Sequence, residues 1–238
     1  MIKPSAGNRP FAFLITAAGS GTRMGGGMKK EFRNLNGRPI LAETLGNFIK
    51  TGLFSYGVIT CIPGSEDEVR ERLTASAVKL DSLSSPLLFC SGGNERQDSV
   101  LFGLNFLSDN CPELLDEGIV LIHDGARPWA STRLIDQVAQ GALKHAACAP
   151  VSPAVDAMKE ISTDGIITGH LSRRKTVSVQ TPQGFAFNEI LAAHKRAAAD
   201  GRHYIDDTEI FSRYEGDVYT VPGSAANKKI TYPEDLEI

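Results

Sequence analysis

Short apolar runs alternate with segments of helical spacing along most of this chain, and this alternation constrains the fold more than any other feature. The segments between the runs carry helical spacing or helix-start residues. Strands and helices that alternate in this way form a mostly parallel sheet with helices on both faces. The chain is therefore expected to be α/β, with a doubly wound, Rossmann-like sheet. The predicted strands are residues 11–16, 56–62, 87–90, 119–123 and 146–151.

Start signals mark three of the predicted helices. Pro39 precedes one of them, because proline suits a first turn in which no backbone N–H is needed. Ser65 with Glu68 has the pattern of a capping box at the start of another helix. Ser131 stands where it can cap a helix that reaches His145.

The size and charge of the chain narrow the class of protein. With 238 residues, of which 42% are hydrophobic, it can bury a substantial core within one α/β domain. The net charge of −3 disfavours a protein that works on nucleic acid or on an anionic membrane. No apolar stretch approaches the roughly 20 residues needed to span a bilayer. The four cysteines are widely spaced and form no C-x-x-C pair, so a cytoplasmic protein is expected.

The pattern changes after Pro150, where a hairpin is predicted. Residues 155–162 and 166–171 are expected to be strands joined by the turn Thr163-Asp164-Gly165. An isolated two-stranded ribbon is marginal in water, so this arm, at about 152–174, is expected to pack on a second copy in a homodimer. A hairpin folded back on its own domain is the alternative. The rest of the chain returns to one domain, 1–238, through strands at 176–180 and 218–221 and a helix at about 188–199.

A glycine-rich segment directly follows the first predicted strand, where open α/β sheets bind ligands. Its glycines, from Gly19 to Gly27, allow a tight turn whose N–H groups face an anion. A dinucleotide fingerprint fails because Met24 stands where the third glycine belongs, and the Gly-Lys-Ser/Thr run of a Walker loop is missing. What remains is a loop with Arg23 and Lys30, two cations that suit a triphosphate. The alternative is a solvated loop with incidental charges.

A second glycine segment follows the third predicted strand. The backbone near Gly93 and the hydroxyl of Ser99 are placed to contact the edge of a nucleotide base. The alternative is that Asn94 or Asp98 simply caps the next helix.

The fourth predicted strand ends at Asp124, beside the expected triphosphate site. A carboxylate there suits Mg²⁺ or a ribose hydroxyl, and Arg127 would face the phosphate of a second substrate. A structural ion pair between these two residues is the alternative. His123 is expected to lie in the core or to support the site residues from behind. Near the end of the chain, Lys229 precedes a helix start capped by Thr231 and is placed to reach the phosphates, unless it is simply solvated.

Taken in order, these segments resemble the 2-C-methyl-D-erythritol 4-phosphate cytidylyltransferases of the non-mevalonate isoprenoid pathway. The likeness covers nearly the whole chain from Phe11, and five blocks in the same order make it specific. The blocks are Ala17-Ala18-Gly19-x-Gly21-x-Arg23-Met24 with Lys30, Gly92-Gly93-x-Glu95-Arg96-x-Asp98-Ser99-Val100, His123-Asp124-x-Ala126-Arg127-Pro128, Gln180-Thr181-Pro182-Gln183-x-Phe185, and Asn227-x-Lys229-Ile230-Thr231-x-Pro233-Glu234-Asp235-Leu236.

The resemblance implies a transfer of CMP from CTP to 2-C-methyl-D-erythritol 4-phosphate, with Mg²⁺ as cofactor and an arm exchanged between the protomers of a homodimer. The implied catalytic residues are Arg23, Lys30, Lys229 and Asp124, with Asp124 at the metal. The implied CTP contacts are Ala17, Ala18, Gly19, Ser20, Gly21, Thr22, Gly93, Asn94, Ser99 and Gly125. The implied acceptor contacts are Arg127, Arg173, Ala157 and Asp206.

Three positions depart from the family pattern. Asn94 replaces an aspartate, while Ala157 and Asp206 replace threonines, and the last two bear on the identity of the acceptor. A cytidylyltransferase for another polyol phosphate, such as ribitol 5-phosphate, is therefore a rival. A catalytically silent CTP-binding regulatory subunit is a rival of another class. Because the chain stops at Ile238, where relatives continue a helix, a longer native chain is also expected, or one fused to the cyclodiphosphate synthase of the same pathway.

Overall fold

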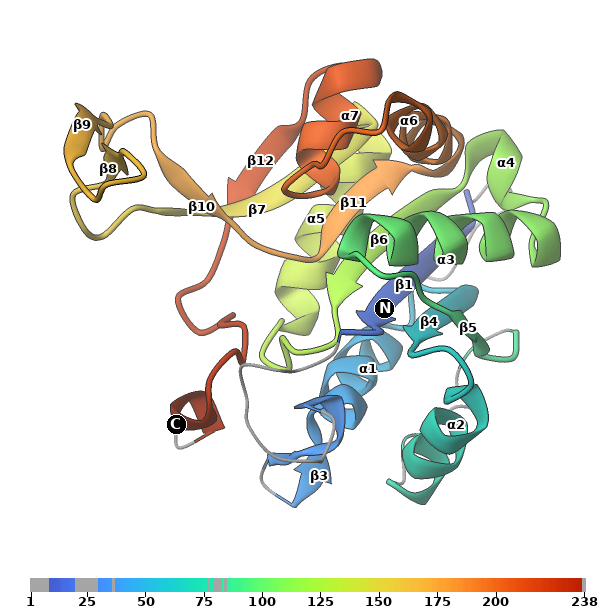
Figure 1. Cartoon of the computed structure of the whole chain (residues 1–238). Helices are drawn as coiled ribbons and strands as arrows, with labels where there is room; N and C mark the ends of the chain where they lie inside the picture. The colour runs from blue at the N-terminus through green and yellow to red at the C-terminus, as the bar shows by residue number, and fades with distance from the viewer. Residues whose placement is uncertain are drawn as a thin grey trace.

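A mixed, mostly parallel sheet runs through the protein (Figure 1). The computed structural model describes residues 9–19, 30–35, 37–76, 78, 83 and 85–236, with only the backbone of Lys30. Four neighbouring strands are mutually parallel and lie in the order β6-β1-β4-β5, and β5 is the last strand of the described sheet on that side. They are β1 (Phe11–Ala17), β4 (Tyr56–Cys61), β5 (Leu88–Ser91) and β6 (Ile119–Asp124). Four of the five apolar runs identified in the sequence therefore form this parallel part of the sheet.

The remaining strands of this sheet gather around β7 (Ala147–Pro153). Between β6 and β7 lies β11 (Gln183–Ala186), which runs antiparallel to both. β10 (Val177–Val179) pairs antiparallel with the later part of β7, and β12 (Tyr219–Pro222) pairs parallel with it. β7 consequently runs in the same direction as the four parallel strands β6, β1, β4 and β5.

Helices cover both faces of the sheet, as expected for a doubly wound fold (Figure 1). On one face α1 (Ile40–Thr51) packs with α5 (Thr132–His145). On the other face α3 (Arg96–Asn110) packs with α6 (Phe187–Asp200). The shorter described elements are α2 (Glu66–Ala75), α4 (Leu114–Glu117), α7 (Asp207–Tyr214), the 3₁₀ turns η2 (Lys30–Phe32) and η4 (Pro233–Leu236), and the ribbon of β2 (Asn34–Leu35) and β3 (Arg38–Pro39). None of the described helices has the length and apolar character needed to cross a membrane.

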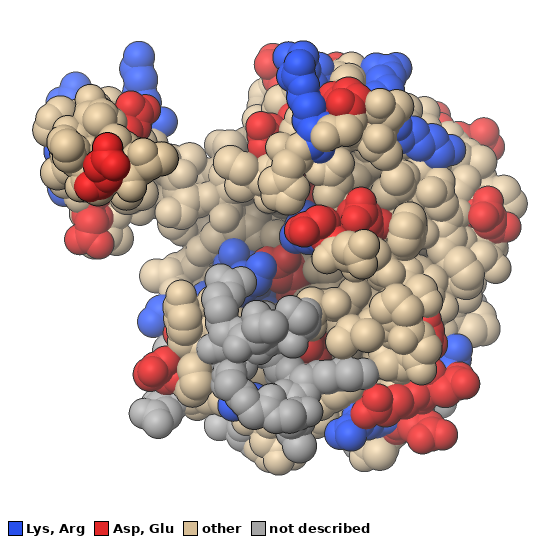
Figure 2. Space-filling view, viewed as in Figure 1, with Lys and Arg blue, Asp and Glu red and all other residues tan. Residues whose placement is uncertain are grey.

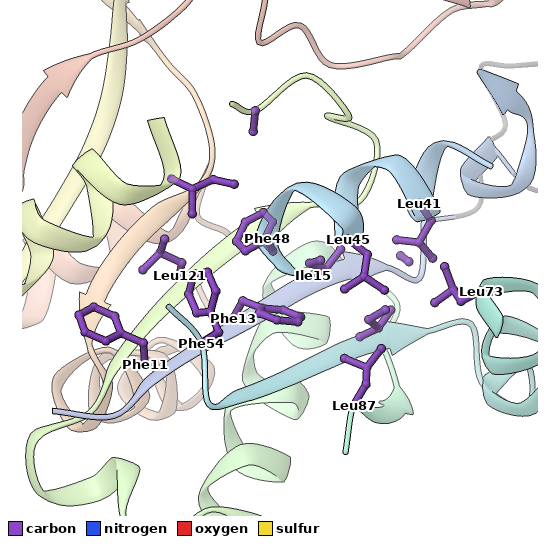
Figure 3. Close-up of a cluster of buried hydrophobic side chains, with 14 of the residues drawn as sticks. Phe11, Phe13, Ile15, Leu41, Leu45, Phe48, Phe54, Leu73, Leu87 and Leu121 are labelled. Atoms are coloured by element: carbon purple, nitrogen blue, oxygen red, sulfur yellow. The ribbon is translucent and has the colours of Figure 1, made fainter. Parts of the chain in front are cut away.

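Successive residues of β1 point to opposite faces and enter two separate hydrophobic clusters. The Phe13 ring centroid lies 5.4 Å from that of Phe48 in α1 and 5.3 Å from that of Phe54, which follows this helix in the chain (Figure 3). Leu14 enters the cluster on the other face. Full burial of a side chain of this size contributes about 1.5–3 kcal/mol. β1 is therefore held firmly on both faces, and the glycine-rich segment starts from a rigid strand.

The predicted hairpin is present as an arm that stands out from the body of the molecule (Figure 1). Its strands are β8 (Lys159–Ile161) and β9 (Ile167–His170), both shorter than expected. Gly165 turns the chain between them with a φ of 80°, in the left-handed region that favours glycine. The alternative in which the hairpin folds back on its own domain is not what the structure shows.

The helix-start predictions had mixed outcomes. The hydroxyl of Ser131 accepts a backbone N–H of the first turn of α5, which confirms this cap. The capping box at Ser65 is wrong, because that hydroxyl instead donates to the carbonyl of Ile62 at 2.7 Å. At α3 the reciprocal capping box is made by Glu95 and Asp98, so the interpretation of Asp98 as a capping residue holds.

The predicted C-terminal helix is described only as the short turn η4. The carboxylate of Asp235 accepts the N–H groups of Thr231 and Tyr232 at 2.7 and 2.9 Å. The prediction that Thr231 caps this element is wrong, because its hydroxyl donates to the carbonyl of Lys229. The turn therefore braces the backbone that carries Lys229.

Candidate active site

Asp124 is the last residue of β6, at the carboxyl edge of the sheet. In the register of the neighbouring strands it lies opposite Thr16 of β1, and the N–H of Gly125 donates to the carbonyl of Thr16 at 3.0 Å. The glycine-rich segment leaves β1 immediately afterwards, through Ala18 and Gly19. The first and third blocks of the sequence therefore meet at the edge where open α/β sheets bind ligands.

Three basic side chains converge on the Asp124 carboxylate. Arg96 Nε lies 3.2 Å from Oδ1, while Arg127 Nε and Lys229 Nζ lie 3.2 and 3.0 Å from Oδ2. Burial alone would raise the pKa of Asp124, but the three cations, Arg96 foremost, hold it well below its usual range. The carboxylate is therefore ionised in the folded protein. Figure 2 shows basic and acidic side chains meeting in a hollow below the arm.

Lys229 reaches this cluster because its segment is pinned beside the end of β6. The backbone N–H of Ile230 donates to the carbonyl of Ala126 at 2.9 Å, and the Ile230 side chain is fully buried. Arg127 Nη1 donates to the carbonyl of Asn227 at 2.9 Å. The structure thus brings together Asp124, Arg127 and Lys229, as predicted. It also contains the Asp124–Arg127 ion pair that was the alternative interpretation.

Arg96 links Asp124 to a second buried carboxylate, that of Asp207. Arg96 Nη2 lies 2.7 Å from Asp207 Oδ2, and His194 Nε2 lies 3.1 Å from Asp207 Oδ1. Burial would raise the pKa of Asp207, but Arg96 and His194 bring it down to about 2. No role had been predicted for these three residues. The general rule that a buried charged side chain needs a partner applies to them, but the sequence does not show which residue that partner is.

Ser99 lies beneath the second glycine segment. Its buried hydroxyl accepts the N–H of Gly93 at 3.0 Å and lies 3.1 Å from the carbonyl of Glu95. A Cβ on Gly93 would come within 2.2 Å of Asp98 Cβ, so only glycine fits there. Asn94 is exposed. Ser99 therefore holds the shape of the segment from below, and Asn94 stays exposed at its surface.

His123 is fully buried, as both interpretations of it, a core residue or one that supports the site, require. Burial lowers its pKa to about 4, so the ring is neutral at physiological pH. Its Nδ1 lies 2.9 Å from the Thr181 hydroxyl, and its Nε2 lies 3.1 Å from the carbonyl of Arg127.

The residues implied for the acceptor do not all lie at this cluster within one chain. Ala157 and Arg173 are exposed on the arm, which projects away from the strand ends (Figure 1). Asp206 is the N-cap of α7, where its carboxylate accepts the N–H of Glu209 at 3.0 Å and the side-chain amide of Gln183 at 2.9 Å. It lines a small cavity together with Arg96 and Asp207.

Five of the implied residues fall wholly or partly outside the described part of the chain. Ser20, Gly21, Thr22 and Arg23 lie outside the described residues, and so does the side chain of Lys30. The described end of β1 fixes only where this segment begins.

At the end of β6, Asp124 offers one carboxylate that could bind a metal ion. Among the described residues, no group of three or more His, Cys, Asp and Glu side chains could hold a metal ion. Mg²⁺ commonly uses one or two carboxylates and takes its other ligands from substrate phosphates and water. Asp124 therefore fits an ion that is bound together with a nucleotide, provided that one of its cationic partners moves away.

Comparison with known proteins decides the family. The family model described as 2-C-methyl-D-erythritol 4-phosphate cytidylyltransferase matches residues 11–238. The chain belongs to this family. It is 38% identical over 223 residues to the 2-C-methyl-D-erythritol 4-phosphate cytidylyltransferase of Clostridium novyi (strain NT), which covers 94% of this chain and 92% of that protein.

Two further comparisons place the chain among longer and solved relatives. The bifunctional enzyme IspD/IspF of Rhodospirillum rubrum is 38% identical over 226 residues, which cover 95% of this chain and 55% of that enzyme. The crystal structure of 4-diphosphocytidyl-2C-methyl-D-erythritol synthase from Anaerococcus prevotii DSM 20548 matches with a TM-score of 0.80 and 26% identity, over 96% of this chain and 93% of that one. The resemblance found in the sequence and the predicted α/β fold are both confirmed.

Proposed function

We propose that this chain is a nucleotidyltransferase that transfers CMP from CTP to 2-C-methyl-D-erythritol 4-phosphate in isoprenoid precursor biosynthesis. The products are 4-diphosphocytidyl-2-C-methyl-D-erythritol and pyrophosphate. The family match over residues 11–238 carries this proposal. Three curated relatives at 36–38% identity are named for this acceptor. The ribitol 5-phosphate enzyme and the silent regulatory subunit are not favoured.

The reaction needs no nucleophilic side chain. An oxygen of the acceptor phosphate attacks the α-phosphorus of CTP and forms the new P–O bond. The bond from the α-phosphorus to the oxygen bridging to the β-phosphate breaks, and its electron pair leaves with pyrophosphate. The acceptor phosphate is already anionic, so the protein contributes positioning and neutralisation of charge.

Lys229 is proposed to exchange its partner when CTP binds. In the described structure its ammonium group neutralises Asp124, and 36% of its side chain is exposed, so it can turn without unpacking the core. The triphosphate offers Lys229 a more highly charged partner. Asp124 would then be the residue that holds Mg²⁺, which when bound neutralises triphosphate oxygens.

The glycine-rich segment is proposed to hold the triphosphate from the other side. It leaves β1 beside Asp124, so cations placed along it, Arg23 and Lys30, would face the same phosphates. The backbone around Ala18 and Gly93 is proposed to contact the cytosine. Arg127 is proposed to face the acceptor phosphate, and Asp206 to border its binding site.

We further propose a cytoplasmic homodimer in which the arm of one protomer reaches the active site of the other. The arm exposes a run of apolar side chains, including Val155 at 85% and Ile161 at 68%, which an isolated monomer rarely leaves in water. A partner that covers them would also bring Arg173 to an acceptor phosphate. The four cysteines are free and buried, as in a reducing compartment.

A coupled pyrophosphate-release assay with two acceptors tests the proposed activity. Turnover of CTP with 2-C-methyl-D-erythritol 4-phosphate should exceed that with ribitol 5-phosphate by at least about a hundredfold in kcat/KM. Equal or faster turnover of ribitol 5-phosphate would overturn the acceptor. Binding of CTP with no pyrophosphate from either acceptor would support the silent subunit instead.

A further inference from the structure

Thr181 occupies the centre of a buried hydrogen-bond chain that links two residues of the proposed site. Its hydroxyl accepts the backbone N–H of Asp124 at 3.1 Å and lies 2.9 Å from Nδ1 of His123. The other ring nitrogen, Nε2, lies 3.1 Å from the carbonyl of Arg127. Thr181, His123 and Asp124 are all buried, so water does not compete for these contacts.

The partners at the two ends fix the direction of each hydrogen bond. The backbone N–H of Asp124 can only donate, and the carbonyl of Arg127 can only accept. His123 must therefore carry its proton on Nε2. A neutral imidazole has one N–H, so Nδ1 accepts and the Thr181 hydroxyl donates to it. Each polar group in this hydrogen-bond network, from the Asp124 N–H to the Arg127 carbonyl, then has a partner.

A second route ties Thr181 to the side chain of Arg127. The Asn227 amide donates to the carbonyl of Thr181 at 2.8 Å, and the carbonyl of Asn227 accepts Arg127 Nη1 at 2.9 Å. Asn227 is fully buried. The backbone of Arg127 is thus held through His123, and its guanidinium group is held through Asn227.

We propose that Thr181 and His123 are positioning residues, which hold the Asp124 carboxylate and the Arg127 guanidinium in the relative orientation that CMP transfer requires. The inference depends on the proposed function, because that function assigns Asp124 and Arg127 to the substrates. Both positioning residues are buried, so they are proposed to act through Asp124 and Arg127. Displacement of a reacting group by about 1 Å can cost about a hundredfold in rate, so a small shift of this pair has a large effect.

Two substitutions at Thr181 distinguish the effect of the hydroxyl group from the effect of the side-chain volume. Thr181→Val keeps the shape but leaves the Asp124 N–H and His123 Nδ1 unpaired, whereas Thr181→Ser keeps the hydroxyl. With CTP and 2-C-methyl-D-erythritol 4-phosphate, Thr181→Val should lower kcat/KM by about tenfold or more. Thr181→Ser should restore it to within about threefold of the wild type.

Thr60→Val is the matched control. Thr60 is also fully buried, but its hydroxyl has no hydrogen-bond partner among the described residues. This variant should keep wild-type turnover. All three variants are compared per folded enzyme, with melting temperatures measured alongside. If Thr181→Val stays within threefold of Thr181→Ser, the positioning role is wrong.

Nitrogen NMR shows which ring nitrogen of His123 carries the proton, and it tests the proposed hydrogen-bond network without any variant. At neutral pH the wild type should show the Nε2–H tautomer, and an Nδ1–H tautomer would overturn the proposal even if Thr181→Val failed to fold. A wild-type protein that binds CTP but releases no pyrophosphate would refute the proposed function. It would not refute the hydrogen-bond network, because the His123 tautomer would still show whether that network forms.

Discussion

Replacement of Arg96 by methionine should destabilise the protein in a way that depends on pH. Arg96 lies between two carboxylates, at 3.2 Å from Asp124 and 2.7 Å from Asp207. Asp124 keeps Lys229 and Arg127 in the variant. Asp207, whose side chain is 1% exposed, keeps His194 as its one ion-pair partner among the described residues.

The expected loss is about 3 kcal/mol at pH 7, because removal of one partner leaves a buried charge uncompensated. The pKa of Asp207, lowered from 3.8 to about 2, by itself corresponds to about 2 kcal/mol. In the wild type this stabilisation is present above the unfolded pKa and is lost as the pH falls toward 2. In Arg96→Met, burial raises the pKa of Asp207. Protonation as the pH falls then removes the unpaired buried charge and its cost in stability.

Urea unfolding of the wild type and Arg96→Met at pH 7 and at about pH 4.5 measures both effects. The difference in unfolding free energy should narrow at the lower pH. Arg9→Met is the matched control, since Arg9 pairs with Glu117 on the surface and its loss should cost less than about 1 kcal/mol. A loss below about 1 kcal/mol for Arg96→Met at pH 7, or a loss that is the same at both pH values, refutes the reasoning.

Three further predictions concern turnover, stability and assembly. Lys229→Ala should lower kcat by about a hundredfold with little change in melting temperature, and near-wild-type pyrophosphate release would remove Lys229 from the mechanism. Ser131→Ala should reduce the unfolding free energy in urea by about 1 kcal/mol, since it removes the cap of α5, and an unchanged midpoint would deny the cap a role. Ile161→Asp with Ile167→Asp on the arm should shift sedimentation from dimer to monomer, whereas a monomeric wild type would argue against the proposed assembly.

The parallel strands β1, β4, β5 and β6 could be predicted because buried parallel strands form continuous apolar runs. β11 (Gln183–Ala186) escaped prediction because it is short, begins with Gln and contains Gly184, and its place is set by pairing with β6 and β7. The capping box at Ser65 failed because sequence does not show whether the hydroxyl faces an N–H group or, as here, the carbonyl of Ile62.

Some residues of the candidate site could likewise be predicted from the sequence, and others could not. Asp124 and Lys229 were predicted because each belongs to a recognisable block next to a strand end or helix start. The Arg96–Asp207–His194 network was not, because Arg96 and Asp207 are 111 positions apart and no local pattern joins them. Only the packing of α6 against both α3 and α7 on one face of the sheet brings their side chains together.

The central claim is that the bond to the α-phosphorus of CTP breaks and CMP moves to the acceptor. Two CTP samples, one with radioactive phosphorus at the α-position and one at the γ-position, test it when each is incubated with 2-C-methyl-D-erythritol 4-phosphate and the products are separated. The account predicts that the α-label appears in the acceptor product and the γ-label in pyrophosphate. A γ-label on the acceptor, or an α-label that remains in free cytidine nucleotides, would contradict it.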